Sequence, residues 1–342
     1  MSLGSRFYRQ KGRVTMDENE LMGSMKVSKA VAKMAIPSVI SSLVTVVYNM
    51  ADTFFVGRTG DPLQVAAVSL TNPIFILFMA FANMFGMGGS AAASMALGEK
   101  KEKRVKQVSS FITYASLIVG IVFAAILLVG MQPVLQLFGA DADTYELAKG
   151  YTTYISYGAP FIIWSAAASV VVRADGASRE AMTGSMIGTV VNIILDPIFI
   201  SGFGMGAAGA AIATTIGNIM ASVYYLWYFC RKSRNMSMAF RYFKCGDRIL
   251  SQVCSAGLPT AIFSALMSIS TIILNQILVA YGNALPATIL SILRQGVLLI
   301  PVLYGLNALL GLHGVIYGQA LTDYVAVLLS IVIWRWKRRK TL

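Results

Sequence analysis

Apolar residues dominate nine long stretches of the chain, and polar and charged residues gather between them. Each stretch is long enough for a helix to cross the hydrocarbon core of a bilayer, which takes about 20 residues. The expected spans cover residues 30–56, 64–96, 108–131, 150–172, 181–201, 207–230, 250–280, 288–310 and 314–334. The pattern therefore predicts an all-α fold, a polytopic transmembrane helical bundle.

The composition excludes several other classes of protein. Hydrophobic residues make up 56% of the 342 residues and charged residues only 13%, against about 25% charged residues in ordinary soluble domains. Three cysteines cannot build a disulfide framework, and the single histidine, His313, cannot make a metal site. The chain has no Walker sequence for a nucleotide. We therefore expect no enzyme activity and no resident cofactor.

The distribution of positive charge orients the spans. The net charge is +13, which in a soluble protein would suggest nucleic acid as a partner. Here the first 33 residues and the 97–107, 173–180 and 231–249 connections hold 20 Lys and Arg residues, whereas the alternate connections hold 2. Basic residues collect in cytoplasmic loops. The bias therefore places the N-terminus in the cytoplasm and favours a lipid bilayer over nucleic acid.

The expected domains follow from the spans and the charge. Residues 1–29 form a cytoplasmic leader, since they lack the apolar core of a signal peptide. A six-helix N-terminal lobe covers 30–230, and a basic cytoplasmic linker covers 231–249. A truncated C-terminal lobe covers 250–334, and residues 335–342 form a basic tail.

An internal repeat indicates that the second lobe lacks its middle. Residues 36–42 align with 258–264 at an offset of 222, and residues 206–209 align more weakly with 311–314 at an offset of 105. The offsets differ by 117 residues, about three helices with their loops. With the N-terminus in the cytoplasm, nine spans would place the basic 335–340 segment on the external side of the membrane. Basic segments prefer the cytoplasmic side. A re-entrant pair, or a last helix that does not cross, is the alternative, so the side of the C-terminus stays open.

Several segments together resemble one transporter family. They are Tyr48–Arg58, Ala66–Leu70, Arg173–Met182, Asn192–Pro197 and Leu293–Gly296. In combination they resemble the multidrug and toxic compound extrusion (MATE) family. The resemblance implies twelve helices in two six-helix lobes and export of drugs or organic cations in exchange for Na+ or H+. Counterparts of the family's eighth to tenth helices are missing from this sequence.

Two acids in the first lobe are candidates for the coupling chemistry. Asp52 and Asp196 lie well inside predicted spans, where a carboxylate is costly and a functional role is the default hypothesis. Two carboxylates in a dry cavity repel each other until a proton or a cation joins them. Their occupancy would then differ between two conformations of the transporter.

Three further features lie near Asp196. Asn192 precedes it by four residues, on the same helix face, and Thr214 on the next helix could reach the same cavity. Pro197 has no N–H, so it leaves the carbonyl of Ile193 without its helical partner. The resemblance implies a cation site, for Na+ or H+, at Asp52, Asn192, Asp196 and Thr214. A buried hydrogen-bonded cluster that only joins helices is the structural alternative.

The expected function is that of a MATE-type secondary active antiporter, a monomer that spans the cytoplasmic membrane of a bacterium several times. Its expected partners are a small-molecule drug or organic cation and the lipid bilayer. A transport-inactive remnant or gene-model artefact, a membrane scaffold and a lipid-linked sugar flippase of related fold are the alternatives. The flippase is disfavoured because the first-lobe spans carry acids and no central Arg. The sequence leaves the substrate and the choice between Na+ and H+ open.

Overall fold

The computed structural model describes residues 36–37, 39–41, 43–44, 48, 54–57, 61–138, 140, 142–233, 235–243 and 248–280. These residues contain helices and connections but no strand, which confirms the predicted all-α class. The chain divides into two compact units, Met1–Ala265 and Leu266–Leu342. The cavity and the contacts described below all lie within the first unit.

The helices of the described chain follow one another with short connections. They are α3 (Pro62–Gly98), α4 (Glu102–Val129), α5 (Met131–Leu137), α6 (Ala142–Ala174), α7 (Ser178–Asp196), the π-helix η1 (Pro197–Gly202), α8 (Gly206–Trp227), the π-helix η2 (Tyr228–Lys232), the 3₁₀ turn η3 (Phe240–Tyr242) and α9 (Ile249–Ala280).

Five of the expected membrane spans are confirmed as helices that are long and apolar enough to cross a bilayer. They cover Leu63–Gly98, Glu102–Val129, Ala142–Ala174, Ser178–Gly202 and Gly206–Lys232. The expected span at 250–280 coincides with α9, whose first part, Ile249–Ser264, is a shorter apolar helix. Most of the expected span at 30–56, both spans after 288 and the basic tail lie outside the described residues.

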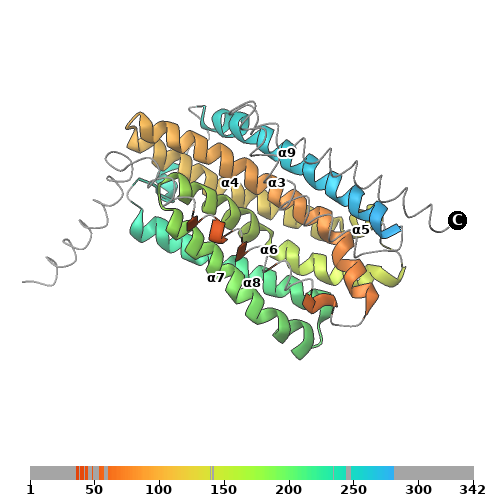
Figure 1. The fold of residues 1–342 in the computed structure, drawn as a ribbon. Helices are drawn as coiled ribbons and strands as arrows, with labels where there is room; N and C mark the ends of the chain where they lie inside the picture. The colour runs from red at the N-terminus through yellow and green to blue at the C-terminus, as the bar shows by residue number, and fades with distance from the viewer. Residues whose placement is uncertain are drawn as a thin grey trace, which may run out of the picture. The chain divides into compact units, whose positions relative to one another are not determined.

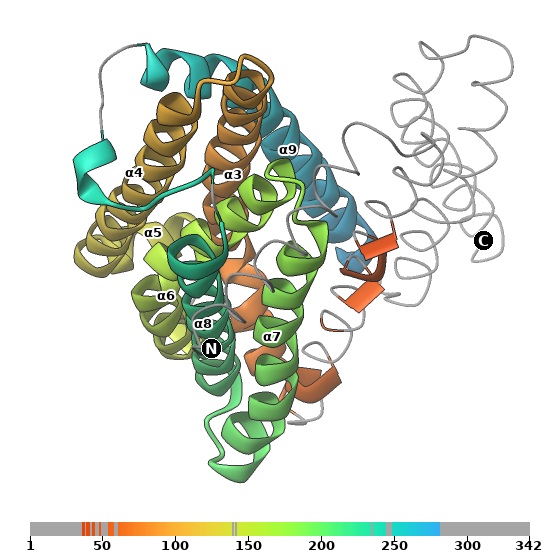
Figure 2. The same ribbon diagram turned by 90° about the vertical axis from the view of Figure 1, so that its left-hand side faces the viewer.

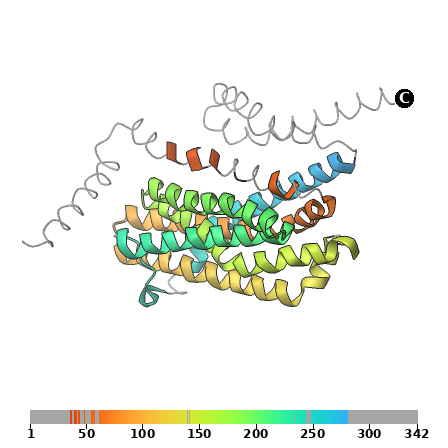
Figure 3. The same cartoon turned by 90° about the horizontal axis from the view of Figure 1, so that it is seen from below.

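The helix α6 lies at the centre of the first unit and contacts α3, α4, α7 and α8. These long helices run along nearly the same direction in Figures 1 and 3. Figure 2 shows α4 and α7 on opposite sides of this group. The core consists of α6 side chains such as Ile162, Ile163 and Ala167, together with aromatic residues such as Phe78 of α3 and Phe111 of α4.

Glycines bring α3 against the first part of α9. A Cβ added to Gly88 would lie 2.0 Å from the carbonyl oxygen of Val253, and one added to Gly257 would lie 2.0 Å from that of Met84. Both distances are far below contact, so only glycine permits this approach. The glycine-rich stretch of the second span serves close helix packing, as in many membrane helices.

The basic connection after η2 is anchored to α4. The hydroxyl of Ser109 accepts a hydrogen bond from the amide of Ser237 at 3.0 Å, and Ser110 donates to the carbonyl of Ala239 at 3.2 Å. Tyr114 donates to the carbonyl of Met238 at 3.0 Å, and its ring makes an edge contact with Phe240. Residues 235–243 therefore follow the surface of α4.

Candidate functional site

The structure describes three of the four residues expected to bind the coupling cation. Asn192 and Asp196 lie on α7, and Thr214 lies on the adjacent α8. The fourth, Asp52, lies outside the described residues, so its place in the site stays a prediction.

Asn192 and Thr214 meet between α7 and α8. The side-chain amide of Asn192 donates a hydrogen bond to the Thr214 hydroxyl at 3.2 Å. The hydroxyl of Tyr48, from the first expected span, lies 3.4 Å from the same Thr214 oxygen. The exposed fractions of Asn192 and Thr214 are 3% and 5%. Three segments of the chain thus bring polar groups to one buried point.

The carboxyl group of Asp196 lies one helical turn beyond Asn192, and its exposed fraction is 0%. At this residue α7 ends and the π-helix η1 begins with Pro197. The expected span at 181–201 is confirmed as Ser178–Gly202, but its last part is not α-helical. Pro197 has no N–H for the carbonyl of Ile193, and residues Pro197–Gly202 take the wider π spacing.

The tight packing around η1 helps to fix this segment. A Cβ added to Gly209 of α8 would lie 2.8 Å from the carbonyl oxygen of Phe199. At the start of α8, Gly206 has a φ of +53°, a conformation that glycine adopts readily. The side chain of Gln64 accepts a hydrogen bond from the amide of Ala207 at 2.8 Å. The carboxylate of Asp196 therefore lies next to a non-α segment that neighbouring helices hold in place.

A cavity of about 430 Å³ extends from the Asn192–Thr214 pair between the helices of the first unit. Its described walls come from the first expected span, α3, α6, α7 and α8. Other polar residues that line the cavity include Ser41, Tyr48, Asn83, Ser165, Thr189 and Asn218. Phe75, Met79 and Val170 add apolar surface. Many polar side chains in a pocket with apolar walls are typical of a site for a small organic molecule.

A second polar layer lies farther along the cavity, toward the ends of α6 and α8 at the 173–180 and 231–249 connections. The hydroxyl oxygens of Ser169 and Ser185 are 3.3 Å apart, and those of Ser185 and Tyr225 are 3.0 Å apart. Tyr225 donates to the carbonyl of Ala181 at 2.8 Å. This layer joins α6, α7 and α8 through hydroxyl groups.

Arg173 lines the same end of the cavity, which the sequence analysis did not anticipate. Its guanidinium donates to the carbonyl of Ser169 at 3.3 Å and to the Ser169 hydroxyl at 3.0 Å. In the sequence, Arg173 stands out only as a basic residue of the 173–180 connection and as the first residue of the Arg173–Met182 segment. The available signal was its position at the end of a span, four residues after Ser169, which lets the side chain reach back along its own helix.

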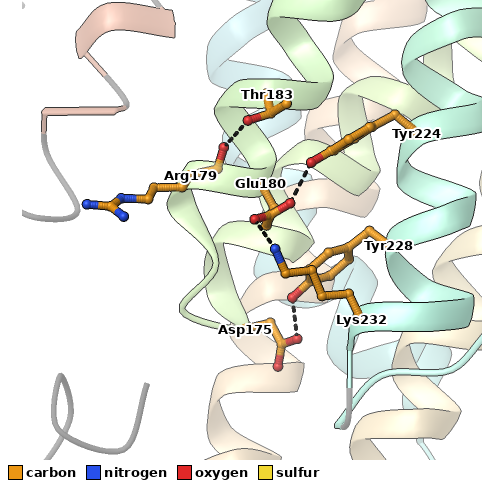
Figure 4. Close-up of polar contacts among 7 residues, drawn as sticks. All are labelled: Asp175, Arg179, Glu180, Thr183, Tyr224, Tyr228 and Lys232. Carbon is orange, nitrogen blue, oxygen red and sulfur yellow. Dashed lines mark hydrogen bonds and ion pairs between the residues drawn. The ribbon is translucent and has the colours of Figure 1, made fainter. Parts of the chain in front are cut away.

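The two acids of the connection between α6 and α7 face the end of α8 instead (Figure 4). The carboxylate of Asp175 accepts hydrogen bonds from Tyr228 at 2.8 Å, Ser233 at 2.9 Å and Asn235 at 3.1 Å. Burial raises the pKa of Asp175, and the three hydrogen bonds offset part of that rise. Gly176, which follows, has a φ of +82° and makes the turn into α7 possible.

The other acid of this connection, Glu180, forms an ion pair with Lys232 and accepts a hydrogen bond from Tyr224. Together Asp175 and Glu180 tie the start of α7 to α8 and η2, as Figure 4 shows. Both carboxylates therefore hold the start of α7 against α8 and η2 at this end of the first unit.

A protein-family model described as MatE matches residues 37–198, which include most of the first expected span and α3 to α7. The multidrug export protein MepA of Staphylococcus saprophyticus is 35% identical over 257 residues, which cover 75% of this chain and 57% of that protein. The MepA protein of Staphylococcus aureus strain NCTC 8325 is 33% identical over 257 residues, which again cover 75% of this chain and 57% of that protein. The chain is thus similar to MATE transporters over most of its described helices.

Solved MATE structures have the same fold. A crystal structure of a MATE protein in the straight conformation gives a TM-score of 0.73 at 27% identity and covers 92% of this chain and 71% of that one. The structure of an outward-facing multidrug resistance MATE transporter gives a TM-score of 0.71 at 28% identity. The match covers 89% of this chain and 68% of that one. The chain is a multi-pass membrane protein, and it spans 57% of the length of the two MepA relatives.

Proposed function

We propose that this chain is a MATE-type secondary active antiporter that exports drugs or organic cations in exchange for Na+ or H+. The observation that carries the proposal is the fully buried Asp196, one turn from an Asn192–Thr214 pair that lines a cavity of about 430 Å³. The MepA relatives, which are named as multidrug export proteins, support the substrate class.

The residues around Asp196 fit a small hard cation or a proton. A carboxylate, an amide and a hydroxyl group supply oxygen atoms, the donors that such ions prefer. In secondary transporters, interrupted helices often bind the coupling ion, and here α7 changes to π spacing directly after Asp196. Among the described residues no group of three His, Cys, Asp or Glu side chains could hold a metal ion.

The proposed mechanism uses the charge of Asp196. With the ion or proton bound, the carboxylate is neutralised and can stay buried; without it, the buried charge is unfavourable. Substrate in the cavity and the ion at Asp196 would therefore favour different conformations, which is the energetic basis of exchange. Asp52 is the proposed second carboxylate of this site.

The proposal is tested by substrate uptake into everted membrane vesicles that contain the 342-residue chain, because export from the cytoplasmic side is uptake in this orientation. The fluorescent cation rhodamine 123 is the substrate, and a Na+ gradient or a pH gradient is the driving force. We expect gradient-dependent transport by the wild type and at least a tenfold loss in Asp196→Asn. The matched control, Asp143→Asn, changes an exposed acid at the start of α6 and should leave transport unchanged.

Two outcomes contradict the proposal. Wild-type vesicles without gradient-dependent transport would favour the transport-inactive remnant. Unchanged gradient dependence in Asp196→Asn would remove Asp196 from the coupling step. Arg173 is the one charged side chain among the described residues that line the cavity, so the charge of the cavity does not count against the flippase alternative.

A further inference from the structure

Among the residues that the structure describes, no acid forms an ion pair with Arg173. The ion pairs among the described residues are Lys101–Glu99, Lys149–Glu146 and Lys232–Glu180, and Arg173 takes part in none of them. The acids closest in sequence, Asp175 and Glu180, are held by α8, η2 and the segment after it. The acids near Arg173 are thus bound on one side, and Arg173 lines the cavity.

The hydrogen bonds of Arg173 leave part of the guanidinium available. Of its five N–H groups, one donates to the carbonyl of Ser169 and one to the Ser169 hydroxyl. These two bonds to Ser169 hold the guanidinium of Arg173 against α6, so no acid is needed to orient the guanidinium. The remaining N–H groups form the flat, forked donor that matches the two oxygens of a carboxylate.

The hydroxyl layer beside Arg173 adds to this site. Ser169, Ser185 and Tyr225 line the same end of the cavity and are linked to one another. With Arg173 donating to Ser169, the Ser169 hydroxyl can donate to Ser185. The hydroxyls of Ser185 and Tyr225 both donate to the carbonyl of Ala181. Such a chain of oriented hydroxyl groups supports a guanidinium that presents positive charge to the cavity.

The opposite end of the cavity has the complementary chemistry. The Asn192–Thr214 pair lines that end, and the carboxyl group of Asp196 lies one turn beyond Asn192. On α6, Arg173 lies eight residues after Ser165, about 12 Å along the helix axis. The cavity therefore has a guanidinium at one end and a carboxyl group near the other.

We propose that Arg173 is a specificity-determining residue that binds a carboxylate of the transported molecule, so that the cavity prefers dipolar organic cations that also carry a carboxylate. The inference rests on the proposed function only in treating the cavity as the substrate site. It goes beyond that function by naming the anionic group of the substrate and the side chain that binds it.

The test compares two dyes that differ at one group. Rhodamine 110 carries a free carboxylate, and rhodamine 123 is its methyl ester. Binding of each dye to the purified full chain is measured by fluorescence anisotropy, without any ion gradient. We expect the wild type to bind rhodamine 110 more tightly, and Arg173→Gln to weaken that binding by about tenfold. Rhodamine 123 should bind Arg173→Gln within about twofold of the wild type.

Two further variants separate recognition from folding. Arg173→Lys keeps the positive charge and should retain a preference for rhodamine 110 that is weaker than in the wild type. Arg179→Gln removes an exposed arginine of the same connection and should leave both affinities unchanged. Equal weakening of both dyes in Arg173→Gln, no change in either dye, or the same loss in Arg179→Gln would overturn the inference.

The outcomes separate this inference from the proposed function. A chain that binds rhodamine 110 through Arg173 but shows no gradient-driven efflux supports the carboxylate site and contradicts the antiporter. A chain that exports rhodamine 123 but whose dye preference does not depend on Arg173 supports the antiporter and contradicts the carboxylate site.

Discussion

The side-chain amide of Asn192 on α7 donates a hydrogen bond to the hydroxyl of Thr214 on α8 at 3.2 Å. The two helices can approach closely beside this bond because Gly188 and Gly217 face each other, and a Cβ on Gly217 would lie 2.6 Å from the Gly188 carbonyl oxygen. Small residues thus let two polar groups meet inside the bundle. The same contact joins the helices and lines the cavity, so its two roles must be separated by experiment.

Thr214→Val tests whether the hydroxyl group serves the coupling ion. Valine keeps the shape of threonine and removes the oxygen, so we expect a cost of about 1 kcal/mol in stability from the lost hydrogen bond. We also expect a severalfold increase in the Na+ or proton concentration needed for half-maximal efflux. Transport in vesicles at graded ion concentrations measures this shift.

The matched control is Thr215→Val on the next residue. Thr215 donates to the carbonyl of Tyr154 at 3.1 Å, and it does not line the cavity described above. We expect a similar small loss of stability and no change in ion dependence. If both variants lower the thermal stability and neither alters the ion concentration, Thr214 only joins helices.

The spans were predictable because each long apolar run has a single stable solution in lipid, the helix. Asn192, Asp196 and Thr214 could be selected because polar groups stand out in such runs. The bond between Asn192 and Thr214 could not be derived, since it depends on how α7 rotates against α8. Arg173 was missed for a related reason: its position at a span end says nothing about whether the side chain reaches back into the bundle or out to the loop.

Glu180→Gln tests the contacts that tie α7 to α8 and η2. The Glu180 carboxylate accepts from Tyr224 and pairs with Lys232, and its side chain is 18% exposed. We expect a loss of about 1–2 kcal/mol because charge-assisted hydrogen bonds exceed neutral ones. The thermal unfolding of the purified chain measures the loss.

Glu146→Gln is the control for this prediction. Glu146 pairs with Lys149 at 3.4 Å, but its side chain is 74% exposed. Solvent screening should limit its effect to about 0.5 kcal/mol or less. Equal effects of the two substitutions would show that the contacts of Glu180 add no more than an exposed ion pair does.

Asp175 should give the unfolding of the first unit a measurable pH dependence. Burial raises the pKa of Asp175 in the folded chain above its value in the unfolded chain, so the folded state binds the proton more tightly. The contribution of this group to stability is then largest at pH values below the unfolded pKa of about 3.9. It decreases as the pH rises through the raised, folded pKa.

The measurement compares thermal unfolding of the wild type and Asp175→Asn from about pH 4 upward. Asparagine does not titrate, so the difference in stability between the two proteins should change with pH in favour of the variant as the pH rises. A difference that is constant with pH, or that moves in favour of the wild type, would contradict the raised pKa. The exposed Asp143→Asn variant provides the baseline for the removal of one carboxylate.

Gly88→Ala tests the contact between α3 and the first part of α9. The added Cβ would lie 2.0 Å from the carbonyl oxygen of Val253, and that oxygen belongs to helix backbone, which cannot rotate away. The helices must separate, and we expect a loss of about 1–3 kcal/mol in stability, as for other overpacked sites.

Gly98→Ala is the matched control, because no atom lies within 4 Å of the corresponding Cβ. Alanine also favours a helix by up to about 1 kcal/mol over glycine, so the control should unfold at the wild-type temperature or slightly above it. If Gly88→Ala matches Gly98→Ala in thermal unfolding, α3 and α9 do not pack through this glycine.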